Sequence, residues 1–111
     1  MSNYQEPIEQ LDEKTKNISK AITSLKEEVE AVDYYNQRVA TTNDPDLKKI
    51  FEHNRDEEIE HAVMTIEWLR RNMGVWDEEL KETLFKEGPI MGHHGEEGED
   101  SGGLSIGDMK K

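Results

Sequence analysis

The hydrophobic residues in the first third of the chain recur at intervals of three, four and seven positions. They are Ile8, Leu11, Ile18, Ile22, Leu25, Val29, Val32 and Val39. This spacing places them along one side of an α-helix, so it predicts a long amphipathic helix over about residues 8–40. The segment TTNDPD (41–46) ends that helix. Asp44 can cap the next helix, and Pro45 suits its first position.

A second long helix is expected from Pro45 to about Asn72, with Gly74 after it as a left-handed stop. Because the link between the two helices is short, they should be antiparallel neighbours. On another side of the second helix, Ile59, Val63 and Ile66 form an apolar patch that a lone two-helix hairpin could not bury. This patch predicts further packing, against a third helix or another chain.

A third, shorter helix is predicted over residues 75–87, because its apolar residues share one face. These residues are Trp76, Leu80 and Leu84, and Gly88-Pro89 ends the helix. Residues 89–103 lack periodicity and are rich in glycine and acids, which predicts a flexible acidic linker. The last segment, LSIGDMKK, spans 104–111. The expected organisation is an all-α domain over residues 1–88, followed by the linker and a short tail.

The side of the second helix that should face the first is apolar except in its middle. Its residues are Leu47, Phe51, Asn54, Glu58, His61, Ala62, Thr65 and Leu69. Glu58 and His61 are three positions apart, so they point the same way and both can reach one cation. Di-iron and di-manganese sites in helical bundles use this spacing, with one further Glu from each of two other helices. The alternative is a carboxylate at the rim of the contact and a hydrogen-bonded core histidine. Glu57 is near enough to His61 to compete with Glu58.

The first helix must then supply the missing carboxylate. Its segment LKEEVEAVDYY (25–35) offers three glutamates. Glu28 flanks the apolar stripe, whereas Glu27 points almost directly away from it and Glu30 lies further out. Tyr35 follows Glu28 by one heptad on the same flank, as a candidate ligand or hydrogen-bond donor. The alternative is that Glu28 and Tyr35 are ordinary residues at the edge of the helix contact.

One chain therefore offers one Glu and one Glu-x-x-His pair, which is half of a four-helix di-metal set. Two copies packed face to face supply the whole set, so the pattern predicts a homodimer with the metal site at its interface. The composition agrees, because 32% hydrophobic residues in a chain of 111 are too few for a well-buried monomer.

The net charge of -12 favours metal cations as partners and argues against nucleic acids and anionic membranes. The absence of cysteine excludes disulfides and thiolate metal sites. No signal peptide or membrane span is evident, so an intracellular, cytoplasmic protein is expected.

Three segments together resemble the encapsulated ferritins. They are EEVEAVDYYNQR (27–38), HNRDEEIEHAVMTIEWLRRN (53–72) and LFKEGPI (84–90), and the match covers most of residues 8–90. The resemblance implies a ferritin-like antiparallel two-helix hairpin with a short C-terminal helix. It also implies that dimerisation completes the four-helix bundle and forms a di-iron ferroxidase centre, and that the dimers join into an open ring, usually a decamer.

The family's iron ligands fall on Glu28, Glu58 and His61 of each chain, and its nearby tyrosine falls on Tyr35. A peripheral cluster through which metal reaches the site falls on two further glutamates, and a divalent cation such as Ca²⁺ would suit it. These glutamates are Glu27 and Glu30. One departure is that relatives often have Trp immediately before the tyrosine, where this chain has Tyr34.

The tail LSIGDMKK resembles the cargo-loading peptides that dock inside encapsulin shells. In an extended peptide, Leu104 and Ile106 would point the same way into pockets of the shell protein. Gly107 would allow a bend, and Met109 would fill another pocket. A ring would display many such tails at once, which strengthens weak individual contacts. The alternative is a solubilising tail with three incidental apolar residues.

The expected function is therefore oxidation of Fe(II) by O2 or peroxide, with iron stored inside an encapsulin nanocompartment. One alternative is a non-catalytic helical cargo or structural protein whose acids only bind cations. Another is a rubrerythrin-like di-iron peroxidase, although this chain lacks the cysteines of a rubredoxin site that would feed it electrons.

Overall fold

The computed structural model describes residues 4–93, and this part of the chain is helical and contains no β-strand. It divides into two units between Asn72 and Met73. The first unit holds the two long helices and a short 3-10 helix before them. The second holds a short α-helix and a second 3-10 helix. Among the described residues, no helix is long and apolar enough to cross a membrane.

Helix α1 spans Glu13–Thr41 and therefore begins five positions later than its apolar pattern predicted. Leu11 has an extended backbone, with φ −98° and ψ 127°, which separates α1 from the 3-10 helix η1 at Ile8–Gln10. Asp12 then caps α1, because its carboxylate accepts a hydrogen bond of 2.8 Å from the backbone N–H of Thr15. The apolar spacing continues through Ile8 and Leu11, but the cap decides where the helix starts.

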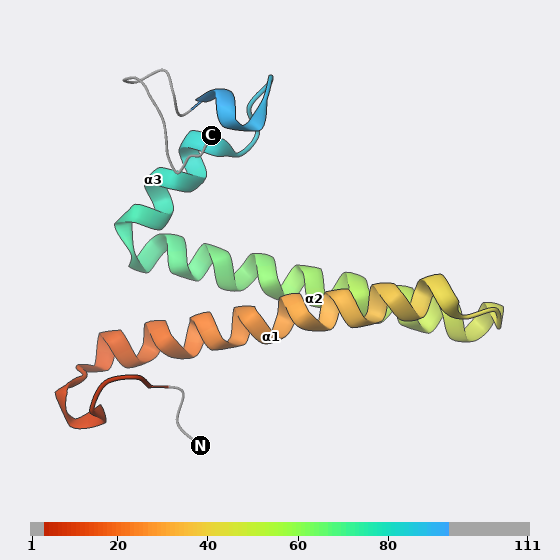
Figure 1. Ribbon diagram of the computed structural model, residues 1–111, viewed down its shortest axis with the longest axis horizontal. Coiled ribbons are helices and arrows are strands. Elements are labelled where there is room, and N and C mark those ends of the chain that lie inside the picture. The colour runs from red at the N-terminus through yellow and green to blue at the C-terminus, as the bar shows by residue number, and fades with distance from the viewer. Residues whose placement is uncertain (1–3, 94–111) are drawn as a thin grey trace. The chain divides into compact units, whose positions relative to one another are not determined.

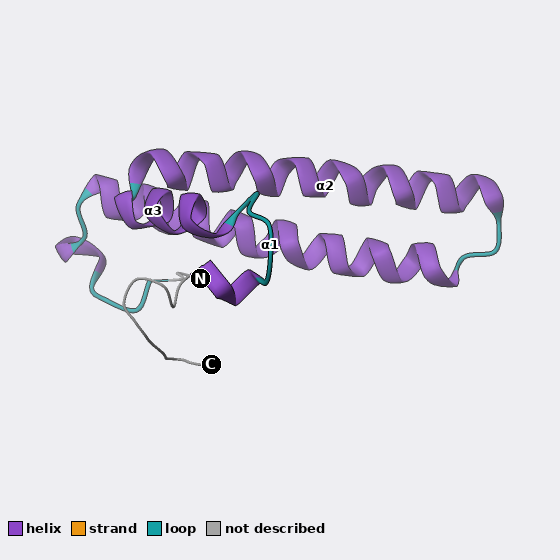
Figure 2. Ribbon diagram, turned by 90° about the horizontal axis from the view of Figure 1, so that it is seen from above, coloured by secondary structure: helices purple, strands orange, loops and turns teal. Residues whose placement is uncertain are grey.

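Helix α2 spans Pro45–Asn72 and begins as the sequence predicted. The carboxylate of Asp44 accepts a hydrogen bond of 3.0 Å from the backbone N–H of Leu47. Pro45 takes the first helical position, where the proline's missing N–H costs nothing. The short connection turns the chain back, so α1 and α2 lie side by side and antiparallel (Figures 1 and 2).

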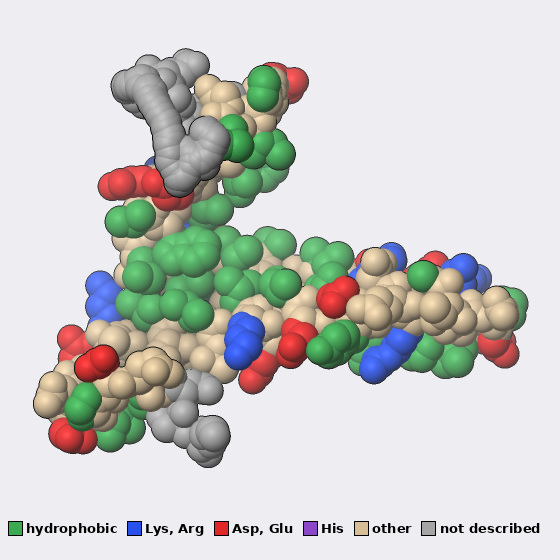
Figure 3. Space-filling model, viewed as in Figure 1, with side chains coloured by type: hydrophobic (Ala, Val, Ile, Leu, Met, Phe, Trp, Pro, Cys, Tyr) green, Lys and Arg blue, Asp and Glu red, His purple; other side chains and the backbone are tan. Residues whose placement is uncertain are grey.

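The two helices bury very few side chains between them. Among the described residues only Ala62 and Leu69 are buried, and both come from the α2 side predicted to face α1. Large apolar side chains remain exposed on the hairpin, and Figure 3 shows hydrophobic side chains gathered over it. The hairpin therefore leaves apolar surface uncovered.

Part of this uncovered surface is one apolar face of the hairpin, formed by two residues from each helix. The exposed fractions are 45% for Ile22, 54% for Val29, 44% for Ile59 and 59% for Val63. Asn36 follows Val29 by one heptad, Arg55 precedes Ile59 by one turn, and Arg55 donates a hydrogen bond of 3.1 Å to Asn36. This bond places both apolar rows on the same side of the hairpin. Ile66, the third member of the predicted patch, is half-buried.

Helix α3 spans Gly74–Thr83 and is shorter than the predicted 75–87. Met73, with φ −138° and ψ 108°, breaks the chain's helical conformation, and Gly74 starts α3. The expectation that Gly74 would be a left-handed stop is therefore wrong. The left-handed conformation occurs instead at Gly88, with φ 88°, where glycine adopts it without strain. Phe85, three residues earlier, also has a positive φ, of 59°.

The 3-10 helix η2 occupies Ile90–His93, within the segment predicted to be linker. Residues 94–103 of that segment and the whole predicted shell-docking tail lie outside the described residues. The tail residues concerned are Leu104, Ile106, Gly107 and Met109.

Candidate metal centre

Glu58 and His61 contact each other on α2, as the three-residue spacing predicted. Glu58 Oε1 and His61 Nδ1 are 3.5 Å apart. Two donor atoms that bind one divalent ion at roughly 2.1 Å each lie about 3–3.5 Å from one another. A carboxylate oxygen and an imidazole nitrogen also suit iron. The two donor atoms are therefore spaced as two ligands of one divalent ion would be.

A second carboxylate also approaches His61. Glu57 Oε1 lies 3.9 Å from the Nε2 atom of His61, and Glu57 Oε2 lies 4.0 Å from Nε2 of His53. The Glu57 side chain is 48% exposed, whereas that of Glu58 is 27% exposed. Glu58 is thus both the nearer carboxylate to His61 and the less exposed of the two.

Glu28 reaches α2 from α1. Its Oε1 atom accepts a hydrogen bond of 3.0 Å from the hydroxyl of Thr65. Glu28 and His61 line the same groove of about 450 Å³ between the two helices. The other residues around it are Lys20, Ala21, Ser24, Met64, Thr65 and Trp68. The structure therefore brings Glu28 and His61 to one groove of the hairpin, and Glu58 adjoins it through its contact with His61.

Tyr35 lies further along α1, and its ring packs against α2. The ring centroids of Tyr35 and Phe51 are 6.2 Å apart, and the guanidinium of Arg38 lies 5.0 Å from the Tyr35 centroid. These contacts hold Tyr35 two turns from Glu28. In the structure, Tyr35 therefore lies within an aromatic and cationic stack.

The two glutamates assigned to the peripheral cluster are exposed on α1. Glu30 Oε2 accepts a hydrogen bond of 3.4 Å from the hydroxyl of Tyr34. Tyr34 therefore contacts one of the two carboxylates directly. Glu27 lies on the same exposed side of the helix.

Within residues 4–93 of a single chain, no three histidine or carboxylate groups gather into a complete metal-binding cluster. Glu58 and His61 contact each other, and Glu28 is joined to the next turn of α2 through Thr65. One chain thus presents its ligand candidates as a pair and a nearby third group.

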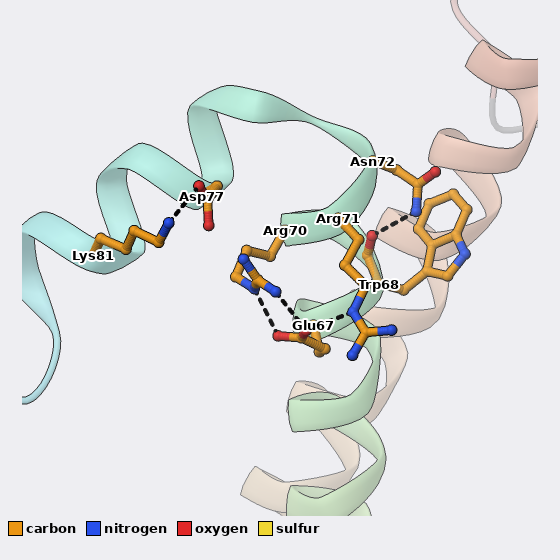
Figure 4. Close-up of polar contacts among 7 residues, drawn as sticks. All are labelled: Glu67, Trp68, Arg70, Arg71, Asn72, Asp77 and Lys81. Atoms are coloured by element: carbon orange, nitrogen blue, oxygen red, sulfur yellow. Dashed lines mark hydrogen bonds and ion pairs between the residues drawn. The ribbon is translucent and has the colours of Figure 1, made fainter.

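A separate polar cluster lies at the C-terminal end of α2 (Figure 4). Glu67 accepts hydrogen bonds of 2.8 Å from both Nε and Nη2 of Arg70, and one of 2.6 Å from Nε of Arg71. These bonds, first from Arg70 and then from Arg71, lower the pKa of Glu67 to about 2. Asn72 donates to the carbonyl of Trp68 nearby. All of these contacts lie within the last two turns of α2.

The contact of Thr65 with Glu28 was not predicted from the sequence. Thr65 was placed on the correct side of α2, four positions after His61. Its contact with Glu28 depends on the register between the helices, which the periodicity of each helix does not determine. The only sequence signal was a hydroxyl residue one turn from His61 on the same side.

An antiparallel hairpin with a Glu on one helix and a Glu-x-x-His pair on the other is half of the four-helix arrangement of ferritin-like di-iron proteins. The chain belongs to the EncFtn-like family, whose model matches residues 3–87. This assignment confirms the resemblance found in the sequence, and with it the all-α, ferritin-like fold.

Two relatives and one solved structure support the assignment. The chain is 55% identical over 100 residues to the "Encapsulated ferritin-like protein" of Rhodospirillum rubrum, covering 88% of this chain and 71% of the relative. It is 56% identical over 87 residues to the "Ferritin-like protein" of Thermotoga maritima, covering 78% and 76%. A crystal structure of a Nitrosomonas europaea protein matches with a TM-score of 0.78 and 51% identity, covering 81% of this chain and 99% of that one.

Proposed function

We propose that this protein is a ferroxidase that oxidises Fe(II) to Fe(III) at a site shared by two copies of the chain. Each copy would contribute Glu28, Glu58 and His61. The observation that carries the proposal is the 3.5 Å contact of Glu58 with His61, together with the groove that His61 lines with Glu28. Membership of a ferritin-like family supports iron as the metal.

The number of ligands favours a site between two chains. Di-iron bundles use four carboxylates and two histidines from four helices, and each copy has two long helices with half of that set. The groove that holds Glu28 and His61 is also lined by Met64 and Trp68, both large and exposed. A second copy laid over this side would cover them and complete the ligands.

The roles of the side chains follow from their chemistry. Carboxylate oxygens hold Fe(II) and favour Fe(III) further, because their negative charge stabilises the more highly charged product. The imidazole of His61 must be neutral to bind. Glu58 would hold an iron ion together with His61, since its carboxylate lies 3.5 Å from the imidazole.

The reaction takes one electron from each of two Fe(II) ions. O2 would accept both electrons with two protons and become hydrogen peroxide. Peroxide as the oxidant would accept them with two protons and become two water molecules. Fe(III) would then leave for mineralisation.

We further propose that an encapsulin shell holds this mineral and receives the protein through residues 104–111. One relative is named an encapsulated ferritin-like protein, which supports a protein compartment as the site of action. Dimers joined into an open ring, with a decamer as the expected size, would leave storage to the shell. They would also present several tails to it at once.

The proposal is tested by the rate of Fe(II) oxidation under air. Glu58→Ala and His61→Ala should each lower the initial rate by more than about 100-fold. Loss of a residue that only supports a metal ligand lowers activity by about 10- to 100-fold, and loss of the ligand itself should cost more. Far-UV circular dichroism should remain close to that of the unchanged protein. Glu60→Ala serves as the control, since Glu60 is an exposed carboxylate on the same helix. Either variant oxidising Fe(II) at the original rate would disprove this ligand set.

A further inference from the structure

A hydrogen-bonded link joins the candidate ligand on α1 to the helical turn that carries His61. The hydroxyl of Thr65 lies 3.0 Å from Glu28 Oε1 and 3.1 Å from the carbonyl oxygen of His61. Thr65 and Glu28 are 37 positions apart in sequence, and the contact is partly buried. It lies at the wall of the groove that Glu28 and His61 share.

The hydroxyl has one proton for these two acceptors. Within α2 the carbonyl of His61 already accepts the backbone N–H of Thr65, four residues later. A carboxylate oxygen is a stronger hydrogen-bond acceptor than a backbone carbonyl that already has a partner. The Thr65 hydroxyl is therefore best placed to donate to Glu28. The carbonyl of His61 keeps its hydrogen bond from the backbone N–H of Thr65.

A glutamate side chain turns about three bonds, so a free carboxylate samples many positions. The bond to Thr65 fixes Oε1 of Glu28 and leaves Oε2 for another partner. Outer residues of this kind orient metal ligands and tune their affinity.

We propose that Thr65 is a positioning residue for the metal site, whose hydroxyl presents the carboxylate of Glu28 toward the groove it shares with His61. The inference rests on the function proposed above, in which Glu28 and His61 bind iron. It adds that metal affinity depends on a side chain that does not touch the metal.

The test measures binding of Co(II), a redox-inactive probe under these conditions, to the full-length protein by titration calorimetry and visible absorption. Thr65→Val keeps the shape of the side chain and removes the hydroxyl. It should raise the Kd for Co(II) by about 10- to 100-fold, whereas the Kd of Thr65→Ser should stay within about threefold of the original value. The Tm of the metal-free protein should change little.

Thr41→Val is the matched control. Thr41 donates to the carbonyl four residues before it at 3.1 Å, as Thr65 can, but its partner is the carbonyl of Gln37 on the exposed end of α1. Its replacement should leave Co(II) binding unchanged. If Thr65→Val does not yield folded protein, Thr65→Ala takes its place with the same expectations.

Glu28→Ala separates failure of this inference from failure of the proposed function. Weak binding by Glu28→Ala with normal binding by Thr65→Val would overturn the role of Thr65 and leave the ligand set intact. Equal weakening in Thr65→Val and Thr65→Ser would overturn it as well, because the hydroxyl would not be the cause. Normal binding by Glu28→Ala would disprove Glu28 as a ligand, and both proposals would fall.

Discussion

At the scale of single residues, the main chemical feature of α2 is that the imidazole of His61 lies close to two carboxylates, those of Glu57 and Glu58. Glu58 is nearer to the imidazole and less exposed than Glu57. Glu57 is also shared with His53, so it lies within a row of polar residues along the outside of the helix. The structure thus favours Glu58 over Glu57 as the carboxylate that acts together with His61.

The Glu67 cluster makes a prediction about pH. Because the folded pKa of Glu67 is lowered from 4.5 to about 2, its stabilising effect is present above about pH 4.5 and is lost as pH falls toward 2. Glu67→Gln should therefore lower the Tm slightly at pH 6, and the difference should shrink on acidification. The cluster is partly exposed, so salt should also reduce the difference.

Thermal unfolding of both proteins between pH 6 and pH 3, at low and high salt, measures this effect. Glu60→Gln on the same helix is the control. A Tm difference for Glu67→Gln that stays constant with pH would contradict the assigned cause.

The candidate site was predictable from the sequence wherever one helix determines the geometry. The Glu58–His61 contact follows from three-residue spacing alone, and the structure shows it. The contact of Glu28 with Thr65 spans 37 residues and needs the register of α1 against α2. Helical periodicity places both residues on the inner flank but does not pair them.

At the scale of elements, side chains just outside the helices determine where the helices begin. Asp44 beside Pro45 was recognisable because both residues have strong positional preferences at a helix start. Asp12 was missed because the apolar spacing of Ile8 and Leu11 runs on in front of it. The short-range hydrogen bond from Thr15 to Asp12 outweighs that pattern. Gly74 was predicted to stop a helix and instead begins one. The helical conformation is interrupted at Met73, and α3 starts at the glycine.

The cap of α2 gives a prediction about stability. Asp44→Ala removes the acceptor for the Leu47 N–H and should lower the free energy of unfolding by about 1 kcal/mol. Asp44→Ser keeps an oxygen at the same place and should retain most of the stability. Urea denaturation of the metal-free protein measures both changes. Equal stability of Asp44→Ala and the original protein would show that this cap is unimportant.

At the scale of the whole molecule, uncovered apolar surface and excess acidic charge occur together. The apolar face of Ile22, Val29, Ile59 and Val63 and the groove beside His61 lie on different sides of the hairpin. Covering either side with another copy would bury surface that one chain leaves in water. The net charge of -12 opposes such association, and cations bound at the interface would relieve the repulsion.

The tail gives a prediction about delivery. Deletion of residues 104–111 should prevent loading into a co-expressed encapsulin shell and leave Fe(II) oxidation unchanged, because the proposed ligands all lie within the α1–α2 hairpin. Purified shells are assayed for the protein by mass spectrometry. Normal loading of the shortened chain would contradict the role of the tail.

The central claim is that two chains complete one di-iron site, and native mass spectrometry during anaerobic Fe(II) titration tests it most directly. We predict that iron appears only in species with an even number of chains, at two iron ions per pair. In Glu58→Ala and His61→Ala these iron-loaded species should be depleted. Rapid oxidation on adding O2 should follow the amount of loaded pairs. A single chain that binds two Fe(II) ions and oxidises them at the full rate would contradict the shared site.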